Sequence, residues 1–295
     1  MSTVAYLFPG QASQFVGMGR TLYENDSRAR ELFELANQIL GFRISDIMFG
    51  GTEEQLKQTD ITQPSVYIHS IISARVQDKP ADAFAVAGHS LGEFSALVAA
   101  RVLSFEDGLS LVRIRASAMQ KACVQNPGTM AAVVGLTDEQ IEEVCAGITD
   151  EIVIPANYNC PGQLVISGSL EGIKIAEERL TAAGAKKVIT LQVGGAFHSP
   201  LMEPARVELA EAIEAINFHQ PLFPIYQNVD ALPHQEALEI KANLVAQLTS
   251  PVKWTQIMKN LIADGATEFV EVGGNGTVLS GFLKRIDRNL PVSAI

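Results

Sequence analysis

The sequence has few cysteines and no long hydrophobic run. Its three cysteines, Cys123, Cys145 and Cys160, have no C-x-x-C spacing, which predicts core thiols and neither a disulfide framework nor a zinc site. No apolar run approaches the roughly 20 residues that a membrane-spanning helix needs. The segment 1–6 also lacks the basic and long apolar regions of a signal peptide. We therefore expect a cytoplasmic protein without a membrane partner.

Basic residues are scarce as well. The chain has 22 Lys and Arg against 33 Asp and Glu, a formal net charge of −11. Nucleic-acid phosphates require concentrated basic side chains, and no stretch combines them with aromatic residues, so no nucleic-acid partner is expected. The only adjacent basic pairs are Lys186-Lys187 and Lys284-Arg285. An acidic partner would have to dock on a local basic patch, and the first pair is the one we consider for it.

Hydrophobic residues are abundant and evenly spread. They make up 47% of 295 residues, enough for the core of one large domain or of a domain with an insert. Val4 to Phe8 predicts a strand, followed by a glycine turn and a helical pattern from Ser27. Strand, turn and helix in this order are typical of an α/β fold. Further helices are predicted at 64–75, 204–216, 241–248 and 254–263, and further strands at 222–227 and 267–272.

The order of predicted elements changes after Asn126-Pro127-Gly128. From there the chain reads strand, helix, strand, strand, helix, strand, at 130–134, 138–146, 152–157, 163–167, 170–183 and 187–193. That is the order of a ferredoxin-like (βαββαβ) module. We therefore interpret residues 127–196 as a small subdomain inserted in a larger α/β subdomain made of residues 1–126 and 197–295.

The most informative motif is Gly88-His89-Ser90-Leu91-Gly92. An apolar run at 83–87 precedes it and a small-residue helical pattern at 94–100 follows it, so the serine is expected at the tip of a sharp strand-to-helix turn. The Leu91 N–H would point at an oxyanion formed when Ser90 attacks an ester or thioester. A bare G-x-S-x-G is common by chance, and these flanks are what make it specific.

A serine nucleophile needs a base, and the chain offers five histidines: His69, His89, His198, His219 and His234. We favour His198, because it follows the last strand of the insert and precedes Ser199-Pro200, residues typical of a helix start. His69 lies in an apolar helix, which predicts packing. His89 is too near the serine to act on it, and the other two stand beside prolines in turns that look solvated.

No acidic residue completes a hydrolase triad. The aspartates between Ser90 and His198 are Asp107, Asp138 and Asp150, all in turns or near helix ends. None stands out. Something other than a carboxylate is therefore expected to orient the imidazole.

Six ordered blocks of the sequence carry a family resemblance. They are Phe8-Pro9-Gly10-Gln11, Gly88 to Glu93, Asn157 to Gly168, Gly195 to Ser199, Gln247 to Trp254 and Glu271 to Gly276. Over essentially its whole length the chain resembles the malonyl-CoA:acyl carrier protein transacylase family. The resemblance implies a hydrolase-like, parallel-sheet large subdomain carrying the ferredoxin-like small one, with the active site in the cleft between them.

The resemblance also implies roles for individual residues. Ser90 would be the acyl-accepting nucleophile and His198 its base and later its acid. The backbone amides of Gln11 and Leu91 would form the oxyanion hole. A main-chain carbonyl, at Gln247, would hold the imidazole, which would account for the missing aspartate.

A free carboxylate on the acyl group requires a cation in the cleft. The family match puts this arginine at Arg115, although helical periodicity alone does not separate it from Arg113. Leu91 and Phe197 resemble the residues at these positions in the malonyl-selective members of the family. A bulky Phe197 would leave little room for an α-methyl group, so we expect a preference for malonyl over methylmalonyl groups and not complete exclusion. Asn159 is expected to support the substrate cleft.

The resemblance implies transfer of a malonyl group from malonyl-CoA to the phosphopantetheine thiol of acyl carrier protein. The reaction would be ping-pong through a malonyl-serine, with no cofactor beyond the CoA thioester substrate, and would supply fatty acid or polyketide synthesis. Two alternatives stay open. One is a serine hydrolase, with Asp230 as a cryptic triad acid, and the other is a non-catalytic module that binds carrier protein.

Overall fold

Two β-sheets organise the computed structural model, which describes residues 3–295. The strands of the larger sheet are β1 (Val4–Phe8), β2 (Ala85–Gly88), β7 (Ile225–Tyr226), β8 (Pro233–His234), β9 (Glu268–Glu271) and β10 (Val292–Ala294). They lie in the order β10-β9-β1-β2-β7-β8. Neighbouring strands are parallel, except that β8 pairs antiparallel with β7. A parallel sheet of this kind confirms the expected α/β class.

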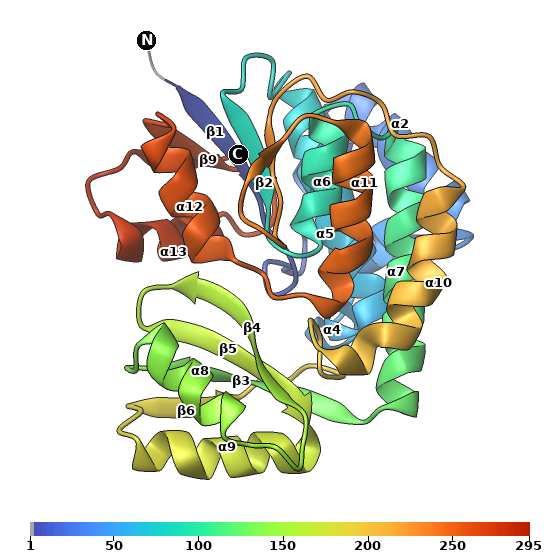
Figure 1. Cartoon of the computed structure of the whole chain (residues 1–295). Coiled ribbons are helices and arrows are strands. Elements are labelled where there is room, and N and C mark those ends of the chain that lie inside the picture. The colour runs from blue at the N-terminus through green and yellow to red at the C-terminus, as the bar shows by residue number, and fades with distance from the viewer. Residues whose placement is uncertain (1–2) are drawn as a thin grey trace.

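The side chains of β1 show why helices cover both faces of this sheet. Successive strand residues point to opposite faces. Tyr6 and Phe8 pack with one set of helices, and Ala5 and Leu7 pack in a second apolar cluster with α12 (Trp254–Ala263) and α13 (Val278–Ile286). The first set includes α2 (Ser27–Leu40), α5 (Thr59–Val76), α6 (Gly92–Ala99) and α7 (Phe105–Gln125). Figure 1 shows β1 and β2 between these two groups of helices.

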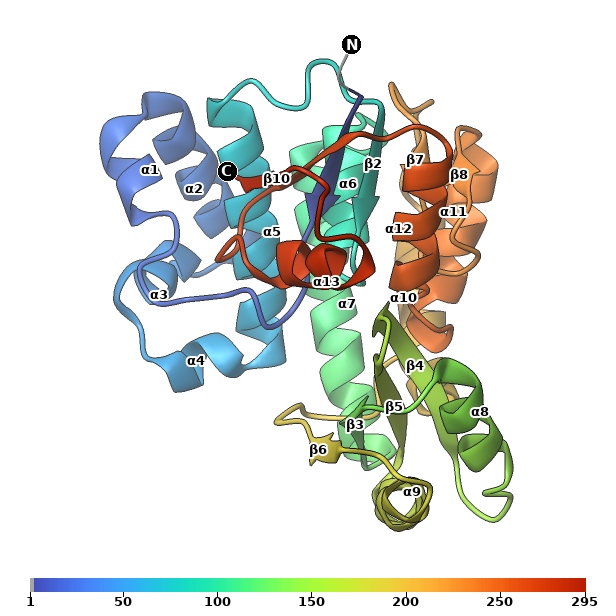
Figure 2. The same ribbon diagram turned by 90° about the vertical axis from the view of Figure 1, so that its left-hand side faces the viewer.

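The remaining helices of this subdomain extend its first face. They are α1 (Arg20–Asn25), α3 (Ile44–Gly50), α4 (Glu53–Lys57), α10 (Glu203–Glu214) and α11 (Ala237–Ala246), with short 3-10 turns at Pro200–Met202 and Gln247–Thr249. In the second view, α1 to α4 lie on one flank and α10 and α11 on the other (Figure 2).

The smaller sheet forms a separate subdomain below the first in both views (Figures 1 and 2). Its elements are β3 (Gly128–Val134), α8 (Asp138–Ala146), β4 (Val153–Cys160), β5 (Gln163–Ser169), α9 (Leu170–Ala182) and β6 (Lys187–Thr190). The strands are antiparallel in the order β4-β5-β3-β6, and the two helices cover a face of the sheet around their own apolar cluster. The predicted ferredoxin-like order is confirmed. All four strands fall within 127–196, while the limits of that segment stay a prediction.

Main-chain hydrogen bonds join the two subdomains beside the cleft. The N–H of Tyr158 donates to the carbonyl of Val252 at 2.9 Å, and the N–H of Val252 donates to the carbonyl of Ala156 at 2.8 Å. At the neighbouring edge, Arg285 of α13 donates to Gln163 at 3.1 Å and to the carbonyl of Pro161 at 3.2 Å. The small sheet is therefore held against the segment that leads into α12.

Several predicted element limits were wrong, for local reasons. The helix predicted from Pro64 begins earlier, at Thr59, and the proline lies inside it. The strand predicted over 222–227 is reduced to Ile225–Tyr226, since the N–H of Leu222 donates to the carbonyl of Ala100 and not to the sheet. The helix predicted over 241–248 begins at Ala237. Strands β8 and β10, of two and three residues, carry too little pattern for prediction.

The three cysteines lie in the core, and all are free thiols. Burial raises the pKa of the Cys145 thiol to about 12. Within residues 3–295, no three or more His, Cys, Asp or Glu side chains are grouped as metal ligands. No helix in that same range has both the length and the apolar character needed to cross a membrane.

Two helical glycines give a matched test of how closely α6 packs against β1. A Cβ at Gly92, where α6 begins, would lie 2.0 Å from the backbone oxygen of Phe8, whereas a Cβ at Gly281 in α13 would meet nothing within 4 Å. We expect Gly92→Ala to lower the free energy of unfolding by about 3 kcal/mol or more through overpacking. Gly281→Ala should raise it by about 0.5–1 kcal/mol. Urea unfolding measures both, and equal effects would contradict the close approach of α6 to β1.

Candidate active site

The turn from β2 to α6 holds Ser90 in a left-handed conformation, with φ of 52°. The glycines on either side of it, Gly88 and Gly92, cannot be replaced by a residue with a side chain. A Cβ at Gly88 would lie 2.0 Å from the backbone of Gly92, and one at Gly92 would meet the Phe8 oxygen at the same distance. The serine is therefore displayed at the carboxyl end of β2, above the start of a helix, as a nucleophile requires.

Ser90 and His198 are hydrogen-bonded to each other. The Ser90 Oγ lies 2.7 Å from His198 Nε2, and His198 Nδ1 lies 3.1 Å from the main-chain oxygen of Gln247. Because a carbonyl only accepts, Nδ1 carries the proton and Nε2 has the lone pair that can take the serine proton. Burial, and then the charge of Arg115, lower the pKa of His198 to about 3, so the imidazole is neutral at pH 7.

Arg115 is a buried cation beside the serine. Its side chain on α7 donates to the Ser90 Oγ at 3.0 Å, to Gln63 Oε1 at 2.8 Å and to Gln247 Oε1 at 3.4 Å. It is 1% exposed, and its Nε has no hydrogen-bond partner. Burial lowers the pKa of the guanidinium to about 10, which still leaves it charged at pH 7. Arg113 lies exposed on the same helix, so the structure brings only Arg115 to the site.

Two backbone amides next to the serine have no protein acceptor. Within residues 3–295, the N–H groups of Gln11 and Leu91 donate to no oxygen of the chain, although both residues line the cleft. The N–H of Ser90 is different, because it donates to Asn228 Oδ1 at 2.7 Å. The two unused donors can stabilise a negatively charged oxygen formed beside Ser90.

Both subdomains line the cleft in which these groups meet. The cavity has a volume of about 190 Å³. The large subdomain supplies Ser90, His198 and Phe197, and the small subdomain supplies Asn159 and neighbouring residues of β4 and β5. Asn159 Oδ1 lies 2.9 Å from Nε2 of His89, so its side chain connects the two walls of the cleft.

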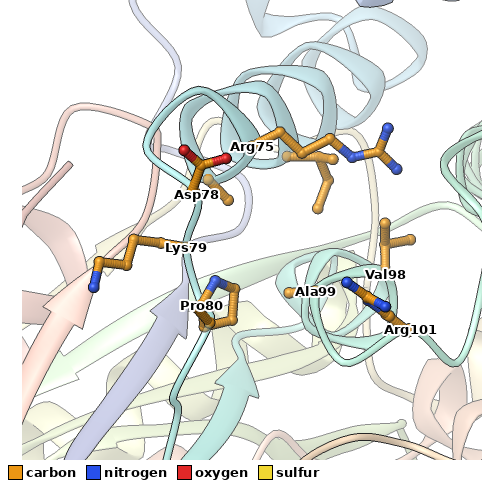
Figure 3. A pocket seen from close by; sticks show the side chains of 10 residues that line it. Arg75, Asp78, Lys79, Pro80, Val98, Ala99 and Arg101 are labelled. Atoms are coloured by element: carbon orange, nitrogen blue, oxygen red, sulfur yellow. The ribbon is translucent and has the colours of Figure 1, made fainter.

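A second cavity, of about 460 Å³, lies elsewhere, and its lining residues include no Ser, Cys or His (Figure 3). It is lined by the last residues of α5 and α6, such as Arg75 and Val98, and by the segments that follow them, which include Lys79 and Arg101. Basic side chains at helix C-termini are favoured by the helix dipole, which explains the arginines without a ligand. The cleft around Ser90 is therefore the candidate active site.

Known proteins share this fold and a large part of this sequence. A family model described as acyl transferase domain matches residues 5–293. The chain belongs to this acyl transferase family. It is 42% identical over 298 aligned residues to the malonyl CoA-acyl carrier protein transacylase of Bacillus subtilis, covering 100% of this chain and 94% of that protein.

Solved structures lead to the same family. A malonyl-transacylase in complex with a type II PKS acyl-carrier protein matches with a TM-score of 0.95 and 38% identity, covering 100% of this chain and 96% of the other. The malonyl-CoA:acyl carrier protein transacylase of Xanthomonas oryzae matches with a TM-score of 0.94 and 41% identity, covering 100% and 94%.

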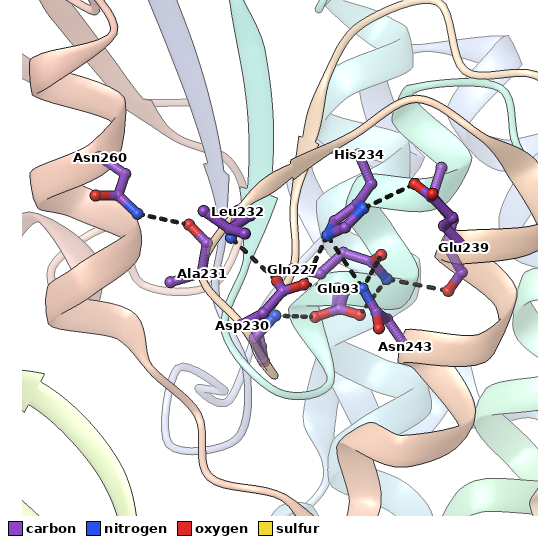
Figure 4. Close-up of polar contacts among 11 residues, drawn as sticks. Glu93, Gln227, Asp230, Ala231, Leu232, His234, Glu239, Asn243 and Asn260 are labelled. Carbon is purple, nitrogen blue, oxygen red and sulfur yellow. Dashed lines mark hydrogen bonds and ion pairs between the residues drawn. The ribbon is translucent and has the colours of Figure 1, made fainter.

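In the described part of this acyl transferase domain, residues 3–295, none of the other histidines hydrogen-bonds to the serine hydroxyl. His69 is buried, its Nδ1 accepts from the N–H of Gly274 at 3.0 Å, and burial lowers its pKa to about 4. His219 is exposed. The prediction of a solvated His234 was wrong, because its side chain is 14% exposed and lies 2.8 Å from Asp230 (Figure 4). Asp230 thus pairs with His234, whereas the imidazole of His198 bonds to a carbonyl.

Three polar residues of the site, and the side-chain role of Gln247, were not predicted from the sequence. Gln63 and the side chain of Gln247 contact Arg115, and Asn228 contacts the serine turn. Glu93 lies beneath them and accepts from the N–H of Asn228 at 2.8 Å. The only available signal was that Glu93 and Gln247 stand in blocks that resemble the family.

The lowered pKa of His198 predicts how stability depends on pH. Below the ordinary pKa of about 6.5, the unfolded chain binds a proton that the folded state does not bind until about pH 3, so stability is lost as the pH falls. His198→Gln should therefore lose less stability than the unmodified protein between pH 6.5 and 4, by up to about 1.4 kcal/mol per pH unit.

Urea unfolding at a series of pH values measures this difference. The exposed His219 provides a control, and His219→Gln should follow the unmodified protein. If His198→Gln also followed it, the imidazole would not be the buried neutral group described above.

Proposed function

We propose that this acyl transferase domain moves a malonyl group from malonyl-CoA to the phosphopantetheine thiol of acyl carrier protein, through an ester on Ser90. One observation carries the choice of acyl group. The guanidinium of Arg115 lies 3.0 Å from the Ser90 Oγ, is buried, and forms no ion pair with a carboxylate anywhere in residues 3–295. The names of the relatives, malonyl transacylases, support the same choice.

A buried cation without a carboxylate in contact with it is costly, and a matching anion removes much of that cost. A malonyl group places its free carboxylate one methylene from the carbonyl that is esterified. With the ester on Ser90, that carboxylate is within reach of Arg115, including the Nε that has no partner. Charge-assisted hydrogen bonds of this kind are about twice as strong as neutral ones. Acetyl groups lack the carboxylate, so they would leave Arg115 unpaired.

The first half-reaction follows from the serine–histidine pair. His198 Nε2 takes the Ser90 proton while Oγ bonds to the thioester carbonyl carbon. The N–H groups of Gln11 and Leu91 stabilise the oxyanion. The carbon–sulfur bond then breaks, and CoA leaves as a thiol with the proton from His198.

The second half-reaction reverses these steps with another thiol. The phosphopantetheine thiol gives its proton to His198, and its sulfur attacks the ester carbonyl. The bond to Ser90 Oγ breaks, and Oγ recovers the proton. The mechanism is therefore ping-pong, and no cofactor takes part in either half.

The charge of Arg115 links the choice of acyl group to the basicity of His198. The positive charge of Arg115 is one of the two main causes of the lowered pKa of His198. A malonyl carboxylate beside Arg115 offsets this charge, which raises the basicity of the imidazole when the correct acyl group is bound. An acyl group without a carboxylate gives no such gain.

The rest of the cleft fits a small acyl group. Phe197, beside His198, and Leu91, after the nucleophile, restrict space for an α-methyl substituent. Asn159 closes the opposite wall through its hydrogen bond to His89. We place the enzyme in the cytoplasm, where it would supply malonyl units for fatty acid or polyketide synthesis.

Mass spectrometry of the intact protein tests the intermediate. Incubation with malonyl-CoA should add one malonyl group, and Ser90→Ala should abolish the adduct because, in residues 3–295, no other hydroxyl contacts His198 Nε2. The adduct should disappear on addition of holo acyl carrier protein and persist without it. Rapid release of free malonate in the absence of carrier protein would instead identify a hydrolase.

Two arginines on one helix test the carboxylate site. Arg115→Ala should lower malonyl transfer by on the order of 100-fold or more, because a buried charged pair is lost, and should lower acetyl transfer far less. The exposed Arg113→Ala on α7 is the matched control and should change neither rate by more than about two-fold. Transfer rates from malonyl-CoA and acetyl-CoA are compared. An equal loss for both acyl groups in Arg115→Ala would contradict the role.

A further inference from the structure

The side-chain amide of Asn228 bridges two main-chain groups of the turn that leads into the nucleophile. Asn228 follows β7, and its Oδ1 accepts from the N–H of Ser90 at 2.7 Å while its Nδ2 donates to the carbonyl of Gly88 at 2.7 Å. We propose that Asn228 is a positioning residue that holds Ser90 in its left-handed, reactive conformation. This inference rests on the proposed role of Ser90 as nucleophile.

The two hydrogen bonds oppose a specific relaxation. A left-handed conformation is unfavourable for a residue with a side chain, so Ser90, at φ of 52°, is strained. Rotation toward an ordinary conformation would turn its N–H away from Asn228 and carry Oγ away from His198. Because Asn228 also occupies the Ser90 N–H, the oxyanion is left with the two free amides described above, those of Leu91 and Gln11.

Gln247 completes the same arrangement from the other side. Its Nε2 donates to the carbonyl of Ser90 at 2.9 Å, and it lies 3.4 Å from Asn228 Oδ1. Its own carbonyl accepts from His198 Nδ1. Both peptide groups of the nucleophile are therefore fixed by side-chain amides, and one of these residues also fixes the base.

A buried carboxylate supports Asn228 from below. Glu93 accepts from the N–H of Asn228 at 2.8 Å and from Gln227 Nε2 at 3.0 Å, and burial raises its pKa to about 7. Figure 4 shows Glu93 and Gln227 within a polar network that continues to Asn243. The loop carrying Asn228 is thus set by a hydrogen-bond network of its own.

The same loop offers a matched control. Asn260 Nδ2 donates to the carbonyl of Ala231 at 2.9 Å, an amide-to-main-chain bond of the same type (Figure 4). It touches neither Ser90 nor Gly88. Asn260→Ala therefore measures what loosening the loop does by itself, and Asn228→Ala adds the loss of the bridge.

The experiment measures how fast Ser90 reacts with a fluorophosphonate, which does not depend on malonyl recognition. Thermal stability and the KM for malonyl-CoA are measured in parallel. We expect Asn228→Ala to label on the order of 100-fold more slowly, as expected for a misplaced reacting group, with KM within about three-fold. Asn260→Ala should label within about two-fold of the unmodified protein despite a comparable loss of thermal stability.

Asn228→Asp tests the bridge in a second way, through the pH dependence of its labelling rate. When protonated, aspartic acid can accept from the Ser90 N–H and donate to the Gly88 carbonyl, as asparagine does, whereas the ionised form cannot donate. Its labelling rate, relative to the unmodified protein, should rise as the pH falls from 8 to 6. Glu93 is the ionisable group that contacts Asn228 directly. Arg115 and His198 are connected to it through Gln247, and Asp230 and His234 through Gln227 and Asn243. Dividing by the rate of the unmodified protein corrects for the titration of these groups.

The outcomes separate the two proposals. Labelling of Asn228→Ala at the unmodified rate, equal slowing in Asn260→Ala, or a pH-independent ratio for Asn228→Asp would each overturn the positioning role. Failure of the unmodified protein to form a malonyl adduct, with labelling of Ser90 by the fluorophosphonate intact, would overturn the malonyl assignment and leave the positioning role standing.

Discussion

The close approach of α6 to the end of β1 is the constraint on which the site depends. A Cβ at position 92 would collide with Phe8 of β1, and a Cβ at position 88 would collide with Gly92, so both positions require glycine. Between them, Ser90 takes a left-handed conformation. That turn displays the serine hydroxyl to the cleft and leaves the next amide free. A helix placed even slightly farther from the sheet would relax the turn and separate Oγ from the imidazole.

Charge inside the cleft is the second organising element. Arg115 and His198 are both buried, yet one remains a cation and the other is kept neutral. Amide side chains, those of Gln63 and Gln247, surround the guanidinium without neutralising it. The positive charge of Arg115 also lowers the pKa of its neighbour, His198.

The sequence was sufficient for local features and insufficient for distant contacts. Glycine spacing and flanking periodicity predicted the serine turn, and the βαββαβ order of the small subdomain is confirmed. Helical periodicity did not distinguish Arg115 from Arg113, because the difference depends on which face of α7 meets the cleft. Asn228 could not be predicted at all, since it lies 138 positions from the serine that it contacts and no local pattern marks it.

The imidazole of His198 is oriented by the main-chain oxygen of Gln247 and not by a side chain. Every amino acid carries such an oxygen, so no point mutation at 247 deletes this acceptor. Alanine scanning would therefore miss the group that fills the position of a triad acid, and its contribution would emerge only from backbone chemistry, such as an ester replacing the following amide. A hydrogen-bond acceptor supplied by the main chain is insensitive to side-chain substitution in a way that an aspartate is not.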